Sequence, residues 1–273
     1  MEEKHEIAVT QMRKSVEKLG CSTENYNDLT LMRFLIARSM DIEKAAKMFT
    51  QWKKWRDDFL PSGFIPESEV PDELGSRKVY LQIPSSNAPH HHPVVIVKAN
   101  KHFSSKDQLQ FKKFVVHFLE KSIASSFVEG KEKGDEKLMA ILDLGNITYR
   151  NVDPRALITG FQFLQGRDKL IHFYLVSKKY VCCIKSAPNY YPERLAKCYI
   201  ISMPWFFVSV WKMVSVFLEK TTLEKIVIVG NDEEERKSFI NEIGEDTLPE
   251  EYGGLAKLTA IQDVTIHHLP ESN

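Results

Sequence analysis

The stretch LMAILDL, residues 138–144, decides the fold class. Six of its seven residues are apolar. A short run with so little polar alternation is typical of a β-strand that is covered on both faces. Similar strand patterns occur at Lys78–Ile83, Pro93–Lys98, Lys197–Met203 and Lys225–Val229. Segments with helical spacing separate these runs, so the sequence predicts an α/β sheet with helices packed over it.

Three helices are predicted between and after these strands. Ser104, with Asp107 three residues further on, resembles a capping box that opens a helix running to about Phe127. A second helix is expected over residues 153–165 and a third over residues 232–243. These helices supply the cover that buried strands require.

Three more helices are predicted before the first strand. The first covers residues 3–19, the second carries Arg38, and Asp41 is a good N-cap for the third. Proline and glycine then become frequent, which indicates a turn-rich connector. The predicted divisions are an N-terminal helical region (1–60), a connector (61–77), an α/β domain (78–258) and a C-terminal tail (259–273).

The bulk composition excludes some classes of protein. The 37 basic and 37 acidic residues give a net charge of zero, whereas nucleic-acid-binding proteins usually carry a basic excess. The four cysteines form no CxxC pair, as expected for thiols kept reduced inside the cell. The N-terminal residues lack the apolar segment of a secretory signal, and no apolar run reaches the length of about 18 residues that a membrane span needs. We therefore expect a cytoplasmic protein.

Familiar catalytic and metal-binding motifs are missing from the sequence. It contains no nucleophile elbow, P-loop, dinucleotide fingerprint or HExxH motif. His90–His92 stand in a proline-flanked loop and point in divergent directions, so a solvated loop is expected rather than a metal site. Asp143 ends the central strand, where α/β enzymes often keep a catalytic carboxylate. Capping or hydrogen bonding is its expected role, and an enzyme acting on a small hydrophobic substrate remains an alternative.

The segment WFFVSVWKMVSVFL, residues 205–218, is too apolar for an ordinary surface helix. Eleven of its fourteen residues are apolar, whereas a surface helix needs an apolar arc of only somewhat over 100°. It is also too short to cross a membrane. Two interpretations fit this pattern. The helix is buried within the domain, or one face lines an internal apolar cavity while the other is covered only part of the time.

Five motifs, taken in order, resemble the CRAL-TRIO family of lipid-binding proteins. They are RFLIARSMDIEKA (33–45), LMAILDLGNIT (138–148), NYYPERLAKCYIISMP (189–204), FLEKTTLEKIVIVG (217–230) and LPEEYGG (248–254). They extend from about residue 28 to 258. The sequence is most similar to small plant members of the family, which are related to the yeast phosphatidylinositol/phosphatidylcholine transfer protein.

The resemblance implies an N-terminal helical subdomain followed by a mixed five-stranded sheet. This sheet would form the floor of a lipid pocket, which a mobile gate helix closes. The gate would fall on the segment 205–218. The residues expected to line or close the pocket are Trp205, Phe206, Phe207, Val210, Trp211, Val214, Phe217 and Leu218.

The resemblance also implies a headgroup site. Phosphoinositide-binding members hold the inositol phosphate through four positions, of which Arg38, Glu193 and Lys225 match here. Arginine and lysine neutralise a phosphate, while a carboxylate accepts hydrogen bonds from inositol hydroxyls. The alternative for each residue is an ordinary ion pair that joins helices to the sheet. The fourth position, a serine in the family, falls on Leu138, which favours phosphatidylcholine or another lipid over phosphatidylinositol.

A second departure from the family is an insertion at residues 166–188. It carries five basic residues and one acidic residue, together with two of the cysteines. One interpretation is a basic, aromatic surface hairpin that helps the protein touch anionic membranes. The preferred interpretation is an alternative or unspliced transcript segment with no selected role, which would be disordered or poorly packed.

These features together predict an intracellular lipid-binding and transfer protein with no enzymatic activity. Its expected ligand is a phospholipid, with no other cofactor and no metal. Its expected partner is a transiently contacted membrane surface, with no nucleic acid, and the protein is expected to be a monomer. The alternatives are an interaction module with a vestigial pocket and the small enzyme considered above.

Overall fold

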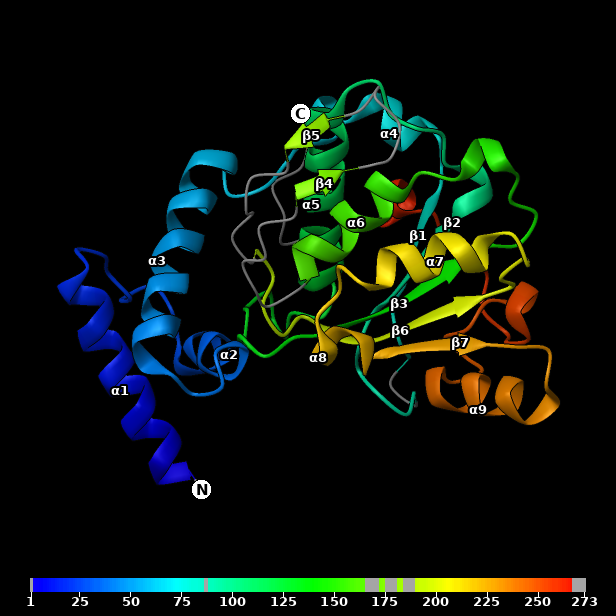
Figure 1. Ribbon diagram of the computed structural model, residues 1–273. Helices are drawn as coiled ribbons and strands as arrows, with labels where there is room; N and C mark the ends of the chain where they lie inside the picture. Colours follow the sequence, from blue (N-terminus) through cyan, green and yellow to red (C-terminus); the bar gives the residue numbers. More distant parts are fainter. Residues whose placement is uncertain (1, 86–87, 165–171, 175–180, 184–189, 267–273) are drawn as a thin grey trace.

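The computed structural model describes residues 2–85, 88–164, 172–174, 181–183 and 190–266. Its centre is a five-stranded sheet in the order β1-β2-β3-β6-β7 (Figure 1). Only the pairing of β1 with β2 is antiparallel within this sheet. The predicted mixed five-stranded sheet is therefore confirmed. The strands are β1 (Val79–Gln82), β2 (Val94–Lys98), β3 (Leu138–Asp143), β6 (Leu195–Ile201) and β7 (Ile226–Val229).

Helices cover both faces of the sheet (Figure 1). The helices α5 (Gln108–Ala124), α6 (Pro154–Leu164) and α7 (Phe207–Ser215) lie on one face, and α9 (Glu233–Ile243) lies on the other. Two short helices, α4 (Pro71–Gly75) and α8 (Lys220–Leu223), precede β1 and β7. Short 3-10 turns occur at Glu67–Glu69, Ala99–Lys101, Tyr149–Asn151, Glu250–Tyr252 and Ile261–Asp263.

The two faces of the sheet have separate apolar cores, because successive side chains of a strand point to opposite sides. In β1, Val79 and Leu81 belong to a buried cluster with Phe114 of α5. Tyr80, between them, belongs to a second cluster with Phe239 of α9. Burial on both sides explains why the central strand has a nearly continuous apolar sequence.

The three predicted N-terminal helices form a bundle beside the sheet (Figure 1). They are α1 (Glu2–Lys18), α2 (Asp28–Ala37) and α3 (Ile42–Phe59), and they share a buried cluster of their own. Trp52 of α3 reaches beyond this cluster, and its Nε1–H donates to the backbone oxygen of Tyr190 at 2.8 Å. The bundle is thereby attached to the chain that leads into β6.

The helix starts test the predicted caps. The Asp41 carboxylate accepts from the backbone N–H of Lys44 at 3.0 Å, so Asp41 caps α3 as predicted. The capping box predicted for Ser104 and Asp107 is wrong. Asp107 is itself the N-cap of α5, and its carboxylate accepts from two backbone N–H groups of the first turn at 2.9 Å each. An aspartate side chain can cap a helix by itself, so a capping-box residue three positions before it is not required.

The insertion 166–188 contains β4 (His172–Tyr174) and β5 (Val181–Cys183). These strands pair antiparallel in a two-stranded sheet that is separate from the central sheet. The rest of the insertion lies outside the described residues, and so does Gln165, where α6 was expected to end. Both interpretations of the insertion therefore stay predictions.

Candidate functional site

An apolar cavity of about 160 Å³ lies between the sheet and its helical cover. Val97 of β2 and Cys198 of β6 contribute to its floor, and Phe118 of α5, Phe161 of α6 and Phe207 of α7 also line it. Burial raises the pKa of the Cys198 thiol to about 12, which is consistent with an environment that disfavours charge. The predicted pocket above a sheet floor is therefore confirmed.

The segment predicted as the gate forms α7 and its flanking turns, so its helix is shorter than predicted at both ends. One side of this segment consists of buried residues, whereas Trp205 at its start is 81% exposed. The predicted gate residues divide into buried Phe207, Val214 and Leu218, half-buried Phe206, Val210, Trp211 and Phe217, and exposed Trp205. Exposed Val208 and Val216 add to the apolar surface. The segment thus combines a core-facing side with an apolar outer side.

The inner side of α7 closes the cavity. Phe207 belongs to a buried cluster with Leu142 of β3 and Ile200 of β6. The Trp211 ring lies 6.2 Å from that of Phe161 on α6, measured between centroids. Helix α7 therefore rests on the sheet and on α6, and apolar contacts hold it in place.

Glu193 and Lys225, two of the three predicted headgroup residues, contact each other. The Lys225 Nζ donates to the Glu193 Oε2 at 3.1 Å, and both side chains are about three-quarters buried. Glu193 precedes β6 and Lys225 directly precedes β7, so the pair lies at the amino edge of two neighbouring parallel strands. Glu193 has a φ of +56°, a conformation that non-glycine residues rarely adopt and that often marks functional sites.

Arg38, the third predicted headgroup residue, lies at the C-cap of α2. Its Nη1 donates to the backbone oxygen of Ala37 at 3.3 Å. Together with Asp41 and Lys44 it lines a hollow on the surface of the helical bundle. The structure therefore brings together Glu193 and Lys225, and it places Arg38 among residues of α2 and α3.

An ion-pair cluster, which the sequence interpretation missed, stands next to Glu193; three of its four members are buried and Glu132 is exposed. Arg194 donates from Nη1 to the Glu136 Oε2 at 2.9 Å and also pairs with Glu132. Arg33 of α2 lies 3.6 Å from the same Glu132 carboxylate. Burial and the neighbouring Arg194 charge lower the pKa of Arg33 to about 9. This arginine cluster (Arg33, Glu132, Glu136, Arg194) fixes the backbone beside Glu193 and connects it to the helical bundle.

Leu138, at the position of the family's serine, is buried at the start of β3 and lines the cavity. Its side chain extends the apolar lining toward the amino edge of the sheet, where Glu193 and Lys225 stand. The cavity wall is therefore apolar where a hydroxyl donor was expected from the family pattern.

Asp143 has the hydrogen-bonding role predicted for it. Its Oδ1 accepts from the backbone N–H of Gly145 at 2.8 Å, and its Oδ2 accepts from the Tyr252 hydroxyl at 2.9 Å. Within the described ranges, no group of three or more His, Cys, Asp or Glu side chains is arranged to hold a metal ion. Within the same ranges, no helix is long and apolar enough to cross a bilayer.

This fold and pocket agree with the comparisons with known proteins. The family model of the CRAL/TRIO domain matches residues 171–254. The CRAL-TRIO domain-containing protein YKL091C of Saccharomyces cerevisiae is 28% identical over 244 residues, which cover 86% of this chain and 73% of that protein. The Sec14 cytosolic factor of Schizosaccharomyces pombe is 24% identical over 257 residues, 91% of this chain and 82% of that protein. The chain is thus similar to CRAL-TRIO proteins over about nine-tenths of its length, and the domain model itself matches its residues 171–254.

Plant and structural relatives extend the comparison. The phosphatidylinositol/phosphatidylcholine transfer protein SFH4 of Arabidopsis thaliana is 26% identical over 256 residues, which cover 90% of this chain and 38% of that protein. The crystal structure of Sfh5 superposes with a TM-score of 0.59 at 17% identity, and the match covers 89% of this chain and 77% of that one. The structural match supports the fold.

Proposed function

We propose that this protein encloses a phospholipid in the cavity between sheet and helices and transfers or presents it at membranes in the cytosol. The observation that carries the proposal is the apolar cavity beneath α7, a helix with apolar residues on its outer side. The relative SFH4 is named for transfer of phosphatidylinositol and phosphatidylcholine. Each enclosed methylene contributes about 0.8 kcal/mol, so acyl chains supply most of the affinity and no catalysis is required.

Lipid uptake requires α7 to move. The cavity has a volume of about 160 Å³, below the range of about 300–1,000 Å³ that is usual for ligand pockets. Among the described residues, apolar contacts to the sheet and to α6 hold α7 on its inner side, and its displacement would widen the cavity. When the protein lies on a membrane, contacts between α7 and lipid acyl chains replace the apolar contacts between α7 and the rest of the protein.

The outer side of α7 provides the membrane contact. The exposed Trp205 ring lies 6.0 Å from the Phe206 ring, which lies 4.5 Å from the ring of exposed Tyr149. Aromatic residues of this kind favour the membrane–water interface. These three rings and Val208, defined here as the aromatic surface, adjoin the helix that must open.

The headgroup is proposed to replace the contact between Glu193 and Lys225 at the amino edge of the sheet. The lysine neutralises a lipid phosphate, and the glutamate accepts from inositol hydroxyls. Arg38, which lines a separate hollow on the helical bundle, stays a predicted headgroup contact. Because Leu138 offers no hydroxyl, the headgroup contacts adjust selectivity among lipids rather than determine binding.

The test compares transfer of phosphatidylinositol and phosphatidylcholine between vesicles by wild type and Lys225→Ala. We expect phosphatidylinositol transfer to fall about tenfold, the loss of one charge-assisted hydrogen bond, while phosphatidylcholine transfer stays within about twofold. Lys220→Ala removes a neighbouring exposed lysine of α8 and is the control, with both rates unchanged. Equal loss of both activities in Lys225→Ala would refute this division of roles.

Native mass spectrometry of the purified protein tests occupancy itself. A bound phospholipid is the expected result. Failure to recover or load any lipid would favour the alternative in which the pocket is vestigial and the surface recruits protein partners.

A further inference from the structure

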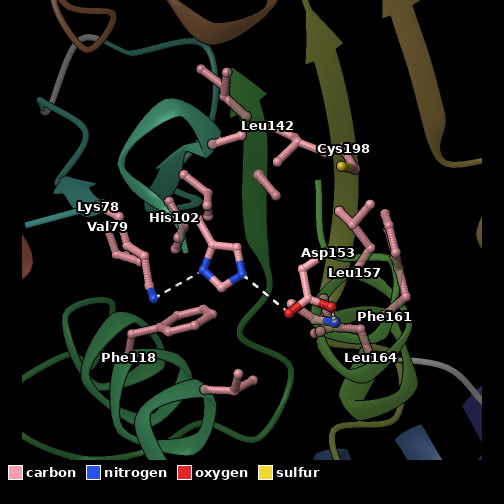
Figure 2. A pocket seen from close by; sticks show the side chains of 18 of the residues that line it. Lys78, Val79, His102, Phe118, Leu142, Asp153, Leu157, Phe161, Leu164 and Cys198 are labelled. Carbon is pink, nitrogen blue, oxygen red and sulfur yellow. Dashed lines mark hydrogen bonds and ion pairs between the residues drawn. The ribbon is translucent and has the colours of Figure 1, made fainter. Parts of the chain in front are cut away.

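One end of the apolar cavity is polar, and it lies at the opposite edge of the sheet from Glu193 and Lys225. Lys78, His102 and Asp153 line the cavity together with its apolar residues (Figure 2). Lys78 directly precedes β1 and its backbone oxygen accepts from Lys98, the last residue of β2. His102 follows β2 after one 3-10 turn, so these side chains meet at the carboxyl edge of the parallel strands. The strand β3 rises about 3.3 Å per residue, so its length separates this polar end from the Glu193–Lys225 pair by roughly 17 Å.

The contacts of His102 determine where its proton lies. Lys78 forms an ion pair with buried Glu73, and its Nζ lies 3.2 Å from the His102 Nδ1. An ammonium group only donates hydrogen bonds, so Nδ1 accepts and the proton of the neutral imidazole is on Nε2. His102 is thereby set to donate from Nε2.

Among the described residues, no acceptor lies within hydrogen-bond reach of the His102 Nε2–H. Only 9% of His102 is exposed, and its Nε2 is buried without a hydrogen bond. The closest acceptor in Figure 2, the Asp153 Oδ2, is 3.7 Å away, which is too long for a hydrogen bond. A buried donor left in this state costs about 1–3 kcal/mol, so a ligand oxygen that reaches it is favoured.

Asp153 is held rigidly beside this donor. Its Oδ1 accepts from the backbone N–H groups of Arg155 and Ala156 at 3.0 and 3.2 Å, which caps α6. Burial raises the pKa of Asp153, but the nearby polar groups of His102 and Ser104, the backbone N–H of Ala156 and the charge of Arg155 outweigh it, and the pKa is lowered overall. Asp153 is therefore an ionised acceptor whose position is fixed by the helix.

The charge around this end favours an uncharged ligand group. Lys78 is balanced by Glu73, and Arg155 Nε lies 3.7 Å from Asp153. A carboxylate or phosphate would meet the Asp153 charge, and a cation would meet Lys78, whose Nζ already lies over the Phe111 and Phe114 rings. A hydroxyl fits both neighbours, since it accepts from the His102 Nε2–H and donates to the Asp153 Oδ2 across the gap between them.

We propose that His102 and Asp153 form a buried anchor for the hydroxyl of an uncharged amphiphile, such as a long-chain alcohol or a sterol-like lipid, whose apolar body fills the cavity. This inference rests on the proposed lipid-binding function and adds a second ligand class to it. Such a ligand enters with its polar group at the carboxyl edge of the sheet, the reverse of a phospholipid held at Glu193 and Lys225.

The test uses four probes of similar chain length. These are 1-dodecanol, its methyl ether, tridecane and dodecanoate, which compete with the neutral fluorophore N-phenyl-1-naphthylamine for the full-length protein at pH 7. The alcohol both accepts and donates hydrogen bonds, the ether only accepts them, and the alkane does neither. We expect the alcohol to bind about tenfold more tightly than the ether, and the ether more tightly than the alkane. Dodecanoate is expected to bind more weakly than the alcohol.

Two variants separate the two hydrogen bonds. Asp153→Asn keeps an oxygen that can cap α6 and should reduce alcohol affinity to the level of the ether. His102→Phe keeps a ring next to Phe111 and should reduce ether affinity to the level of the alkane. Leu164→Ala changes the apolar lining alone and should affect all probes alike. Thermal unfolding of each variant checks that it is folded.

The outcomes are distinguishable. Equal affinities for alcohol and alkane in a wild-type protein that transfers phospholipid would overturn the anchor and leave the proposed function intact. Tighter binding of dodecanoate than of dodecanol would also overturn it, because Lys78 would then be the recognising group. If the protein bound neither phospholipid nor any probe, the proposed function and the anchor would both fail.

Discussion

His117 on α5 is a buried residue whose environment determines its chemistry. Its Nδ1–H donates to the backbone oxygen of Ile65 at 2.7 Å, because a carbonyl oxygen can only accept. Burial lowers the pKa of His117, with a smaller opposing effect of this hydrogen bond and a further lowering by Lys121. The imidazole is therefore neutral in the folded protein at a pH where it would begin to protonate in the unfolded chain.

This depressed pKa predicts that acid weakens the fold. Since the unfolded chain binds the proton more tightly, the free energy of unfolding decreases as the pH falls below about 6.5. The slope that one such group contributes is at most about 1.4 kcal/mol per pH unit. Urea unfolding from pH 7 to pH 5 measures it, and His117→Gln should flatten the dependence. Val116→Ala, an adjacent buried change, should lower stability while retaining the slope. An unchanged slope in His117→Gln would assign the acid sensitivity to other groups.

The sequence predicted single residues unevenly. Asp41 and Asp143 could be assigned because a cap and a strand end are local features. The meeting of Lys78 with His102 and Asp153 could not be predicted, since it depends on how β1 pairs with β2 and on where α6 begins, and both are tertiary features. Arg194 lay within a recognised motif, but its partners Glu132 and Glu136 stand in the loop before β3.

Among the elements, α7 shows what apolar composition predicts and what it leaves open. Its sequence pattern indicated a helix too apolar for an ordinary surface helix. The pattern left open whether this helix is buried within the domain or covers an internal cavity. The structure shows one buried side and one exposed apolar side, which periodicity did not separate because both sides are apolar. Strand positions were predicted closely, since a buried strand has few polar residues and its ends are marked by turns.

The aromatic surface predicts a specific membrane defect. Trp205→Ala removes the most exposed ring, so sedimentation with phosphatidylcholine vesicles should weaken about tenfold, because burial of an aromatic side chain at the interface contributes about 1.5 kcal/mol or more. Lipid occupancy by native mass spectrometry should be unchanged, since Trp205 does not line the cavity. Ile7→Ala, an exposed apolar residue on α1, is the control. Loss of occupancy together with vesicle binding would mean that Trp205 acts on the pocket.

At the scale of the whole molecule, the helical bundle and the sheet are joined by buried charges. The arginine cluster connects α2, the loop before β3 and the start of β6. Close to it, Arg56 of α3 and the Tyr191 hydroxyl both contact the Glu120 carboxylate of α5 at 2.6 Å. The sequence predicted the bundle and the sheet separately, but it did not predict this connection, because ion pairs between distant segments have no local signature.

This connection predicts cooperative loss of stability. Arg194→Met leaves Glu136 buried without its partner, which should lower the free energy of unfolding by about 3 kcal/mol. Urea unfolding should still show one transition for the whole chain. Lys237→Met breaks an exposed pair with Glu233 and should cost no more than about 0.5 kcal/mol. Two separate transitions, or a loss below about 1 kcal/mol, would contradict a structural role for the cluster.

The arginine cluster also limits how this protein can be recombined with its relatives. A chimera that took its first 60 residues from another family member would keep Arg194 and both glutamates but could lose Arg33 and Arg56, which stand on the exchanged helices. Glu132 and Glu136 would keep Arg194, but the largely buried Glu120 would lose Arg56, at a cost of several kcal/mol. The helical bundle and the sheet are therefore energetically coupled. An exchange at this boundary is expected to succeed only when the donor supplies both arginines.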